Sequence, residues 1–106
     1  HRMKVSKKNN LEDCLFATNS EGIKKVNLNS RITGSAALDL AYVSSGRFDG
    51  FFQNNLNLWD IAAGILFIKE SGGKLNNVDF NNINKIAVKA SSSEIFNKML
   101  EKIGKF

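Results

Sequence analysis

Apolar residues are concentrated in the middle of the chain, where the longest unbroken apolar stretch covers residues 61–68. In a helix they would fall on every side, which is typical of a helix sandwiched between two other layers. The stretch predicts a helix that Asp60 caps and that runs to about Ser71, where Gly72 and Gly73 end it. Gly64 inside this helix costs about 1 kcal/mol relative to Ala, so we expect a close backbone approach there. The stretch is far too short to cross a bilayer, and no membrane partner is expected.

Two further helices follow from the same kind of pattern. Residues 36–44 or 36–45 predict a largely buried helix with Ser35 as its N-cap and Gly46 in the left-handed position after its end. Ser91 and Glu94 have the spacing of a capping box that would start the last helix. The apolar positions of that helix fall on one stripe and predict an amphipathic helix docked on the core: Ile95, Phe96, Met99, Leu100 and Ile103.

Short apolar segments between these helices predict strands, over residues 3–6, 14–18, 47–53, 74–75 and 86–89. Residues 20–30 are polar without an apolar period and predict a loop, and Asn54, Asn55 and Asn57 predict a turn. Strands that alternate with helices indicate a layered α/β architecture. The length of 106 residues suits a single domain over residues 1–106.

Composition and charge add little to the fold and function that the apolar pattern predicts. The chain is 42% hydrophobic and 24% charged, a balance that argues against disorder. The net charge is +5, and most basic residues are scattered, as solvated surface lysines are, so contact with nucleic acid is permitted but not indicated. Cys14 is the single cysteine; its apolar neighbours favour a buried thiol, which fits a reducing cytoplasm.

Few residues offer chemistry on their own. Asp60 is either a helix cap or a Mg²⁺ ligand, since Mg²⁺ prefers carboxylate oxygens. The segment Gly34, Ser35 and Ala36 is either an ordinary helix entry or a site where exposed N–H groups meet an anionic or hydroxyl-bearing ligand. Gln53 could hydrogen-bond sugar-like hydroxyls, or it is a surface residue. Structural roles come first for two further carboxylates, Asp39 and Asp49. His1 has no partner motif, and CxxC, GxGxxG, P-loop and GxSxG motifs are absent from the sequence.

Three motifs resemble the inositol monophosphatase family: RITGSAALDLAYV at residues 31–43, GRFDGFF at residues 46–52, and WDIAAG with ESGG at residues 59–64 and 70–73. Their wording is closest to the bacterial branch, which includes extragenic-suppressor proteins. The resemblance implies a layered α/β sandwich of the sugar-phosphatase type, of which this chain would be the C-terminal half, with a mixed sheet and buried helices.

The resemblance also implies an activity. Family members hydrolyse phosphate monoesters of inositol and related polyols with Mg²⁺, which activates water and stabilises developing charge. By that likeness Asp60 is a metal ligand that also approaches a substrate hydroxyl, and Gly34, Ser35 and Ala36 match the segment that contacts inositol. Gln53 stands where the family often has a substrate-binding Glu, so the charge is lost and inositol specificity is not implied. A homodimer and a cytoplasmic location are implied as well.

The remaining parts of the family's site are absent from the sequence. The first signature, Asp-Pro-x-Asp-Gly-Thr, and an upstream Glu supply most metal ligands, and this chain contains no proline. One carboxylate cannot assemble a multi-metal site, so no catalytic residue is assigned and we expect the isolated chain to be inactive without an N-terminal half. Residues 20–30 are also shorter than the segment in which the family usually places a helix. Two alternatives stay open: a non-catalytic module that contacts RNA polymerase or RNA, and a remnant of a split or decaying gene.

Overall fold

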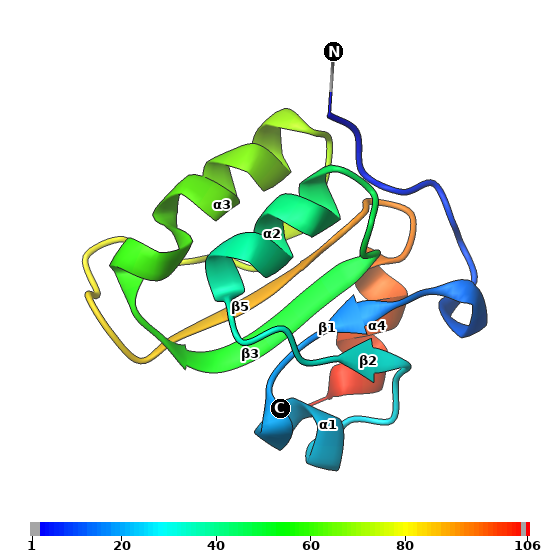
Figure 1. Ribbon diagram of the computed structural model, residues 1–106, viewed down its shortest axis with the longest axis horizontal. Coiled ribbons are helices and arrows are strands. Elements are labelled where there is room, and N and C mark those ends of the chain that lie inside the picture. Colours follow the sequence, from blue (N-terminus) through cyan, green and yellow to red (C-terminus); the bar gives the residue numbers. More distant parts are fainter. Residues whose placement is uncertain (1–2, 105) are drawn as a thin grey trace.

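The structure is a computed structural model that describes residues 3–104 and 106, within which the strands form one five-stranded sheet in the order β2-β1-β3-β5-β4. Figure 1 shows α2 and α3 side by side on one face of this sheet and α4 on the other. His1 and Lys105 lie outside the described residues. The elements are η1 (Leu11–Asp13), β1 (Phe16–Ala17), α1 (Ser20–Lys25), β2 (Ser30–Arg31), α2 (Ala36–Ser44), β3 (Gly50–Leu56), α3 (Leu58–Glu70), β4 (Lys74–Leu75), β5 (Ile86–Ser91) and α4 (Phe96–Ile103).

The sheet is mixed, as expected. β1 pairs in parallel with both β2 and β3, with Phe16 opposite Ser30 on one side and Gly50 on the other. β5 runs antiparallel to β3 and to β4. Because β1, β2 and β3 share one direction, their carboxyl ends meet at one edge of the sheet. The layered α/β fold predicted from the sequence is therefore confirmed.

Two apolar cores lie on opposite faces of the sheet, and β3 contributes to both because successive side chains of a strand alternate. Phe51 packs under α2 and α3 against Leu40, Ile61 and Ile65. Phe52 points the other way and meets the ring of Phe16 edge-on, with 6.3 Å between the ring centroids. The second core also contains buried residues of the α4 region and its surroundings: Cys14, Val26, Ile95, Met99 and Ile103.

Several local predictions are confirmed. Ser35 caps α2, and its hydroxyl accepts a hydrogen bond from the Leu38 N–H at 3.1 Å. Gly46 has a φ of +81°, the left-handed conformation expected after the helix. A Cβ atom on Gly64 would lie 2.6 Å from the Cβ of Leu40, which is the close approach that an internal glycine indicates. The buried positions of α4 are those of the predicted stripe.

The start of α3 differs from the prediction. Asn57 is the N-cap, and its side chain accepts a hydrogen bond from the Trp59 N–H at 2.9 Å. Asp60 is therefore the third residue of the helix and not its cap. The cap moves because β3 continues to Leu56 instead of ending at Gln53, so that the helix follows the strand directly. The turn predicted at residues 54–55 is wrong for the same reason.

Asn55 is accommodated inside β3 by a local irregularity. Its φ is +59°, a conformation that asparagine tolerates better than most residues, and the pairing register of β3 with β5 shifts between Gln53 and Leu56. The strand also begins later than predicted, at Gly50. Arg47 and Phe48 do not join it because their N–H groups both bond the carbonyl of Tyr42, at the end of α2.

Three further predictions are wrong, and the local hydrogen bonds of each segment show what forms instead. Residues 20–25 form the short helix α1 and not a loop, because the Asn19 side chain caps the helix and Glu21 pairs with Lys25 at 3.3 Å. Residues 3–6 are not a strand; Val5 reaches the rest of the fold through one backbone hydrogen bond to Ser71.

The predicted capping box is also absent. Ser91 is the last residue of β5, and its hydroxyl donates to the carbonyl of Ser92. α4 begins at Phe96 without a side-chain cap.

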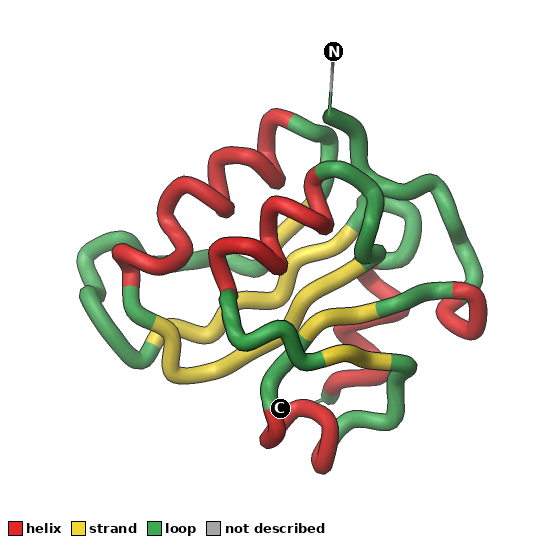
Figure 2. The backbone as a smooth tube through the Cα atoms, in the orientation of Figure 1, coloured by secondary structure: helices red, strands yellow, loops and turns green. Residues whose placement is uncertain are grey.

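The burial of α2 and α3 is only partly as predicted. Both helices bury the side that faces the sheet, but the opposite side of each is exposed, so α3 is not sandwiched between two layers. Figure 2 shows that the long loop between β4 and β5, residues 76–85, passes the start of α3 rather than covering the helices. Within residues 3–104 and 106, no helix combines the length and the apolarity needed to cross a membrane.

Candidate functional site

The candidate residues gather at the edge where the parallel strands end. β2 leads through residues 32–35 into α2, and β3 leads directly into α3. Figure 1 shows the two helices running side by side in the same direction, so that both amino termini lie at this edge. In open α/β sheets, ligands bind outside the carboxyl ends of the strands. Gly34, Ser35 and Asp60 are thus brought to the position where a ligand is expected.

The contact between the two helices sets the position of Asp60. Gly64 packs against Leu40, and Asp60 lies one helical turn before Gly64 just as Ala36 lies one turn before Leu40. Because the helices run in parallel, Asp60 is on the side of α3 that faces α2, level with Ala36. Its carboxylate is exposed and makes no side-chain hydrogen bond to the described residues. The first turn of a helix favours such a negative charge.

The loop before α2 is held by a threonine that the sequence interpretation missed. The hydroxyl of Thr33 accepts a hydrogen bond from the Ser35 N–H at 3.2 Å and donates to the carboxylate of Asp39. Gly34 between them has a φ of +88°, which explains why glycine stands there. A Thr two residues before a helix-capping Ser is the only signal in the sequence that could have pointed to this contact.

Asp39 has the structural role expected of it. It is buried in α2, and one carboxylate oxygen bonds Thr33 while the other has no partner among the described residues. Burial raises the pKa of the Asp39 carboxyl, and the hydrogen bond from Thr33 opposes that rise. Asp39 thereby shapes the Gly34–Ser35 turn from inside the helix.

Gln53 lies on the face of the sheet that α2 and α3 cover, and no hydrogen bond connects it to the other candidate residues within the described part of the chain. It is half-buried in β3, opposite Val88, and alternation places its side chain on the side of Phe51, under α2 and α3. Its carboxamide forms no hydrogen bond with the described part of the chain.

The residues present do not make a magnesium site. Among the described residues there is no group of three or more His, Cys, Asp or Glu side chains close enough to share a metal ion. Asp60 supplies one carboxylate, and Mg²⁺ bound by so few protein groups depends on further ligands. No metal-dependent step can be derived from this chain alone.

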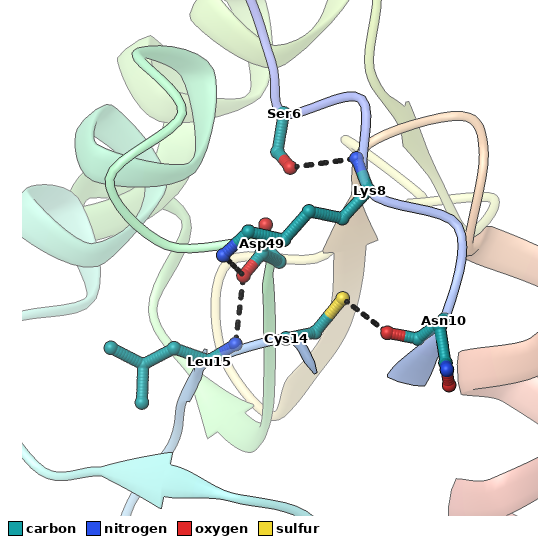
Figure 3. Close-up of polar contacts among 6 residues, drawn as sticks. All are labelled: Ser6, Lys8, Asn10, Cys14, Leu15 and Asp49. Carbon is teal, nitrogen blue, oxygen red and sulfur yellow. Dashed lines mark hydrogen bonds and ion pairs between the residues drawn. The ribbon is translucent and has the colours of Figure 1, made fainter. Parts of the chain in front are cut away.

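A second polar cluster lies at the opposite edge of the sheet and is structural (Figure 3). The buried carboxylate of Asp49 accepts hydrogen bonds from the Leu15 N–H at 2.7 Å and from the ammonium group of Lys8 at 3.4 Å. Cys14 is buried beside it, and its thiol donates to the carbonyl of Asn10. Burial, with the negative charge of Asp49 second, raises the pKa of Cys14 to about 11, so the thiol is not a nucleophile at neutral pH.

A mixed sheet with two parallel helix amino termini beside its strand ends defines an α/β protein whose candidate site lies at that edge. Comparison with known proteins makes the class specific. The chain belongs to the inositol monophosphatase family, whose model matches residues 1–104.

The curated relatives include inositol-1-monophosphatases and proteins named Nus factor SuhB. The chain is 33% identical to inositol-1-monophosphatase of Caulobacter vibrioides over 120 residues, which cover 96% of this chain and 47% of that protein. It is 45% identical over 75 residues to Nus factor SuhB of Haemophilus influenzae, covering 69% of this chain and 28% of that one. A crystal structure of the extragenic suppressor protein SuhB from Bartonella henselae superimposes with a TM-score of 0.81 at 38% identity, covering 97% of this chain and 47% of that chain.

The chain spans about half the length of the curated relatives it matches along its whole length, and it corresponds to the C-terminal part of the family. The alignment with the Caulobacter protein is longer than this chain, so that relative has residues in the matched region without a counterpart here.

Proposed function

We propose that this chain is a single C-terminal domain, residues 1–106, that forms the substrate-binding side of a Mg²⁺-dependent phosphomonoesterase site. The substrate class is inositol monophosphate or a related polyol phosphate. In this proposal Asp60 provides one metal ligand and accepts a hydrogen bond from a substrate hydroxyl, while Gly34, Ser35 and Ala36 line the polyol. Where the family often has a charged Glu, Gln53 offers a carboxamide that both donates and accepts hydrogen bonds. This favours contact with the neutral hydroxyl groups of a polyol at that position.

The observation that carries the proposal is the juxtaposition of the two helix amino termini. The packing of Gly64 on Leu40 brings Asp60 level with Ala36 at the carboxyl edge of the parallel strands. Family membership supplies the chemistry, and the absence of a carboxylate cluster among the described residues limits it. The chain by itself is therefore expected to be inactive and to need a segment that carries the remaining carboxylates.

Complementation tests the proposal. The chain is mixed with the part of the Caulobacter relative that lies outside the matched region, and phosphate release from inositol monophosphate is followed with Mg²⁺ present. We expect turnover by the mixture only, and its loss in Asp60→Asn. Asp79→Asn, an exposed carboxylate in the loop between β4 and β5, is the matched control and should retain turnover. Turnover by the isolated chain, or turnover that survives Asp60→Asn, would contradict the proposal.

A second candidate function rests on the relatives named Nus factor SuhB. It is a non-catalytic module that contacts RNA polymerase or RNA, and the net charge of +5 suits an acidic partner. Binding to immobilised RNA polymerase and to RNA is measured at low and high salt. Absence of salt-sensitive binding to either would reject this function. Under both candidate functions we expect a cytoplasmic location and a homodimer.

A further inference from the structure

Asp39 is a buried acid in the first turn of α2, a position that an apolar residue could fill. The residue is 1% exposed, and one of its two carboxylate oxygens has no hydrogen-bond partner in the described part of the chain. A buried acceptor without a partner lowers stability, and an apolar side chain at the same place would avoid that loss. The carboxyl group therefore calls for an explanation other than the stability of the fold.

The side chain of Asp39 has one hydrogen bond among the described residues, and this bond leads to the turn before the helix. The Thr33 hydroxyl donates to the carboxylate, and its oxygen accepts a hydrogen bond from the Ser35 N–H at 3.2 Å. Because a hydroxyl has a single proton, the bond to Asp39 directs the lone pairs of Thr33 toward other donors. The Asp39 N–H also bonds the carbonyl of Ser35, at 2.9 Å. Asp39 thus holds Ser35 directly through its backbone and indirectly through Thr33.

These hydrogen bonds hold a turn that side-chain packing leaves free. A Cβ atom on Gly34 would have no heavy atom of another segment within 4 Å. The φ of Gly34 is +88°, and glycine has more backbone freedom than any other residue. Thr33 is exposed, so water could replace Asp39 as the partner of its hydroxyl, and little stability depends on the pair. The path of the backbone through Gly34 is what depends on it.

The turn determines where the first N–H groups of α2 point. Among the described residues, the N–H groups of Gly34, Ala36 and Ala37 have no hydrogen-bond partner, as is usual at the start of a helix. They lie at the carboxyl edge of the parallel strands, where the candidate residues gather. We propose that Thr33 and Asp39 are a positioning pair, in which the buried carboxylate acts through the Thr33 hydroxyl to direct these N–H groups toward a polyol bound at this edge.

The pair acts through the turn and does not contact the polyol, and its role rests on the proposed function. Loss of the pair should therefore weaken binding without removing any group that bonds the ligand. A purely structural role would instead require that loss of the pair lowers the stability of the whole chain. Any acceptor at position 39 suffices for the Thr33 hydroxyl, so Asn should be able to replace Asp39, and Ser should be able to replace Thr33.

Amide hydrogen exchange in the isolated chain, followed by NMR, tests the pair without metal or substrate. In Asp39→Leu the Ser35 amide should exchange about fivefold faster, the factor that a net hydrogen bond contributes. Asp39→Ala, which removes the acceptor without adding volume, should show the same change, whereas Asp39→Asn should exchange as the parent does. The Met99 amide, which bonds the Ile95 carbonyl at 2.8 Å in the second core, is the internal control and should not exchange faster. Unchanged exchange at Ser35 in Asp39→Leu and Asp39→Ala, or equal acceleration at Ser35 and Met99, would overturn the proposal.

Turnover then tests the link to the ligand, in the mixture of this chain with Mg²⁺ and the part of the Caulobacter relative that lies outside the matched region. Thr33→Val and Asp39→Leu should raise the KM for inositol monophosphate about tenfold and leave kcat within about twofold, since they misplace binding groups without removing them. Thr33→Ser and Asp39→Asn should keep the KM of the parent. An unchanged KM in Thr33→Val and Asp39→Leu would refute the link between the turn and the ligand. Absence of turnover with the parent chain would refute the proposed function alone, and the exchange of the Ser35 amide would still decide whether the pair holds the turn.

Discussion

Replacing Gly64 with Ala adds one methyl group at the contact between α2 and α3, where two physical effects oppose each other. Alanine is the better helix former by about 1 kcal/mol, which favours the variant. The added Cβ, however, would lie 2.6 Å from the Cβ and 2.7 Å from the Cδ1 of Leu40. The Cβ of Leu40 is fixed by its backbone, so rotation of that fully buried side chain cannot relieve the overlap.

Relief therefore requires the helices to move apart, and overpacking of this kind costs about 1–3 kcal/mol. Since the fixed Cβ is among the overlapping atoms, we expect the upper part of that range and a net destabilisation of about 1–2 kcal/mol. Urea unfolding followed by far-UV circular dichroism measures it. Ala63→Gly, at an exposed position of the same helix, measures the helix-propensity effect alone, about 1 kcal/mol. A Gly64→Ala chain more stable than the parent would show that α2 and α3 are not in such close contact.

Three further predictions concern caps, buried acids and the thiol. Asn57→Ala should destabilise the chain by about 1 kcal/mol in urea unfolding, and Asp60→Asn should destabilise it by less. A larger loss of stability in Asp60→Asn than in Asn57→Ala would indicate that Asp60 caps the helix. Because the pKa of Asp39 is raised on folding, its contribution to stability is present below the unfolded-state pKa and is lost as pH rises through the folded-state value. The difference in unfolding free energy between Asp39→Asn, which keeps an acceptor for Thr33, and the parent should therefore favour the variant more at pH 7 than at pH 4. Urea unfolding at both pH values measures this difference, and a difference that does not vary with pH would contradict the prediction. Cys14, buried and with a pKa of about 11, should react with a thiol reagent far more slowly in the native chain than in denaturant, and rapid native labelling would contradict its placement.

The regular parts of the fold follow from periodicity and capping residues. Ser35, Gly46 and Gly64 each have the role that their residue type and position predict, because the conformations they allow are local properties of the backbone. The failures also have local causes. Asn19 and the pair Glu21–Lys25 stabilise α1 without any apolar period, so a search for periodicity could not detect it.

The candidate site was predictable only in part. The motif likeness singled out Asp60 and the Gly34–Ser35 turn, and the structure shows that they lie at the same edge of the sheet. The contact of Thr33 with Asp39 joins residues six positions apart across a helix start, and nothing in the composition of that segment requires it.

Residue order alone shows that α3 is apolar on every side and that one carboxylate stands near its start. Which side of that helix is covered, and what the carboxylate lies beside, was decided by the tertiary structure. The direction of β1, β2 and β3 brings two helix amino termini together, and the Gly64–Leu40 contact sets their spacing. The uncovered side, with Trp59 and Leu66, appears only when the layers that the chain does contain have been placed. Burial is a property of the packed layers, and a pattern along one chain cannot say which of its surfaces another segment covers.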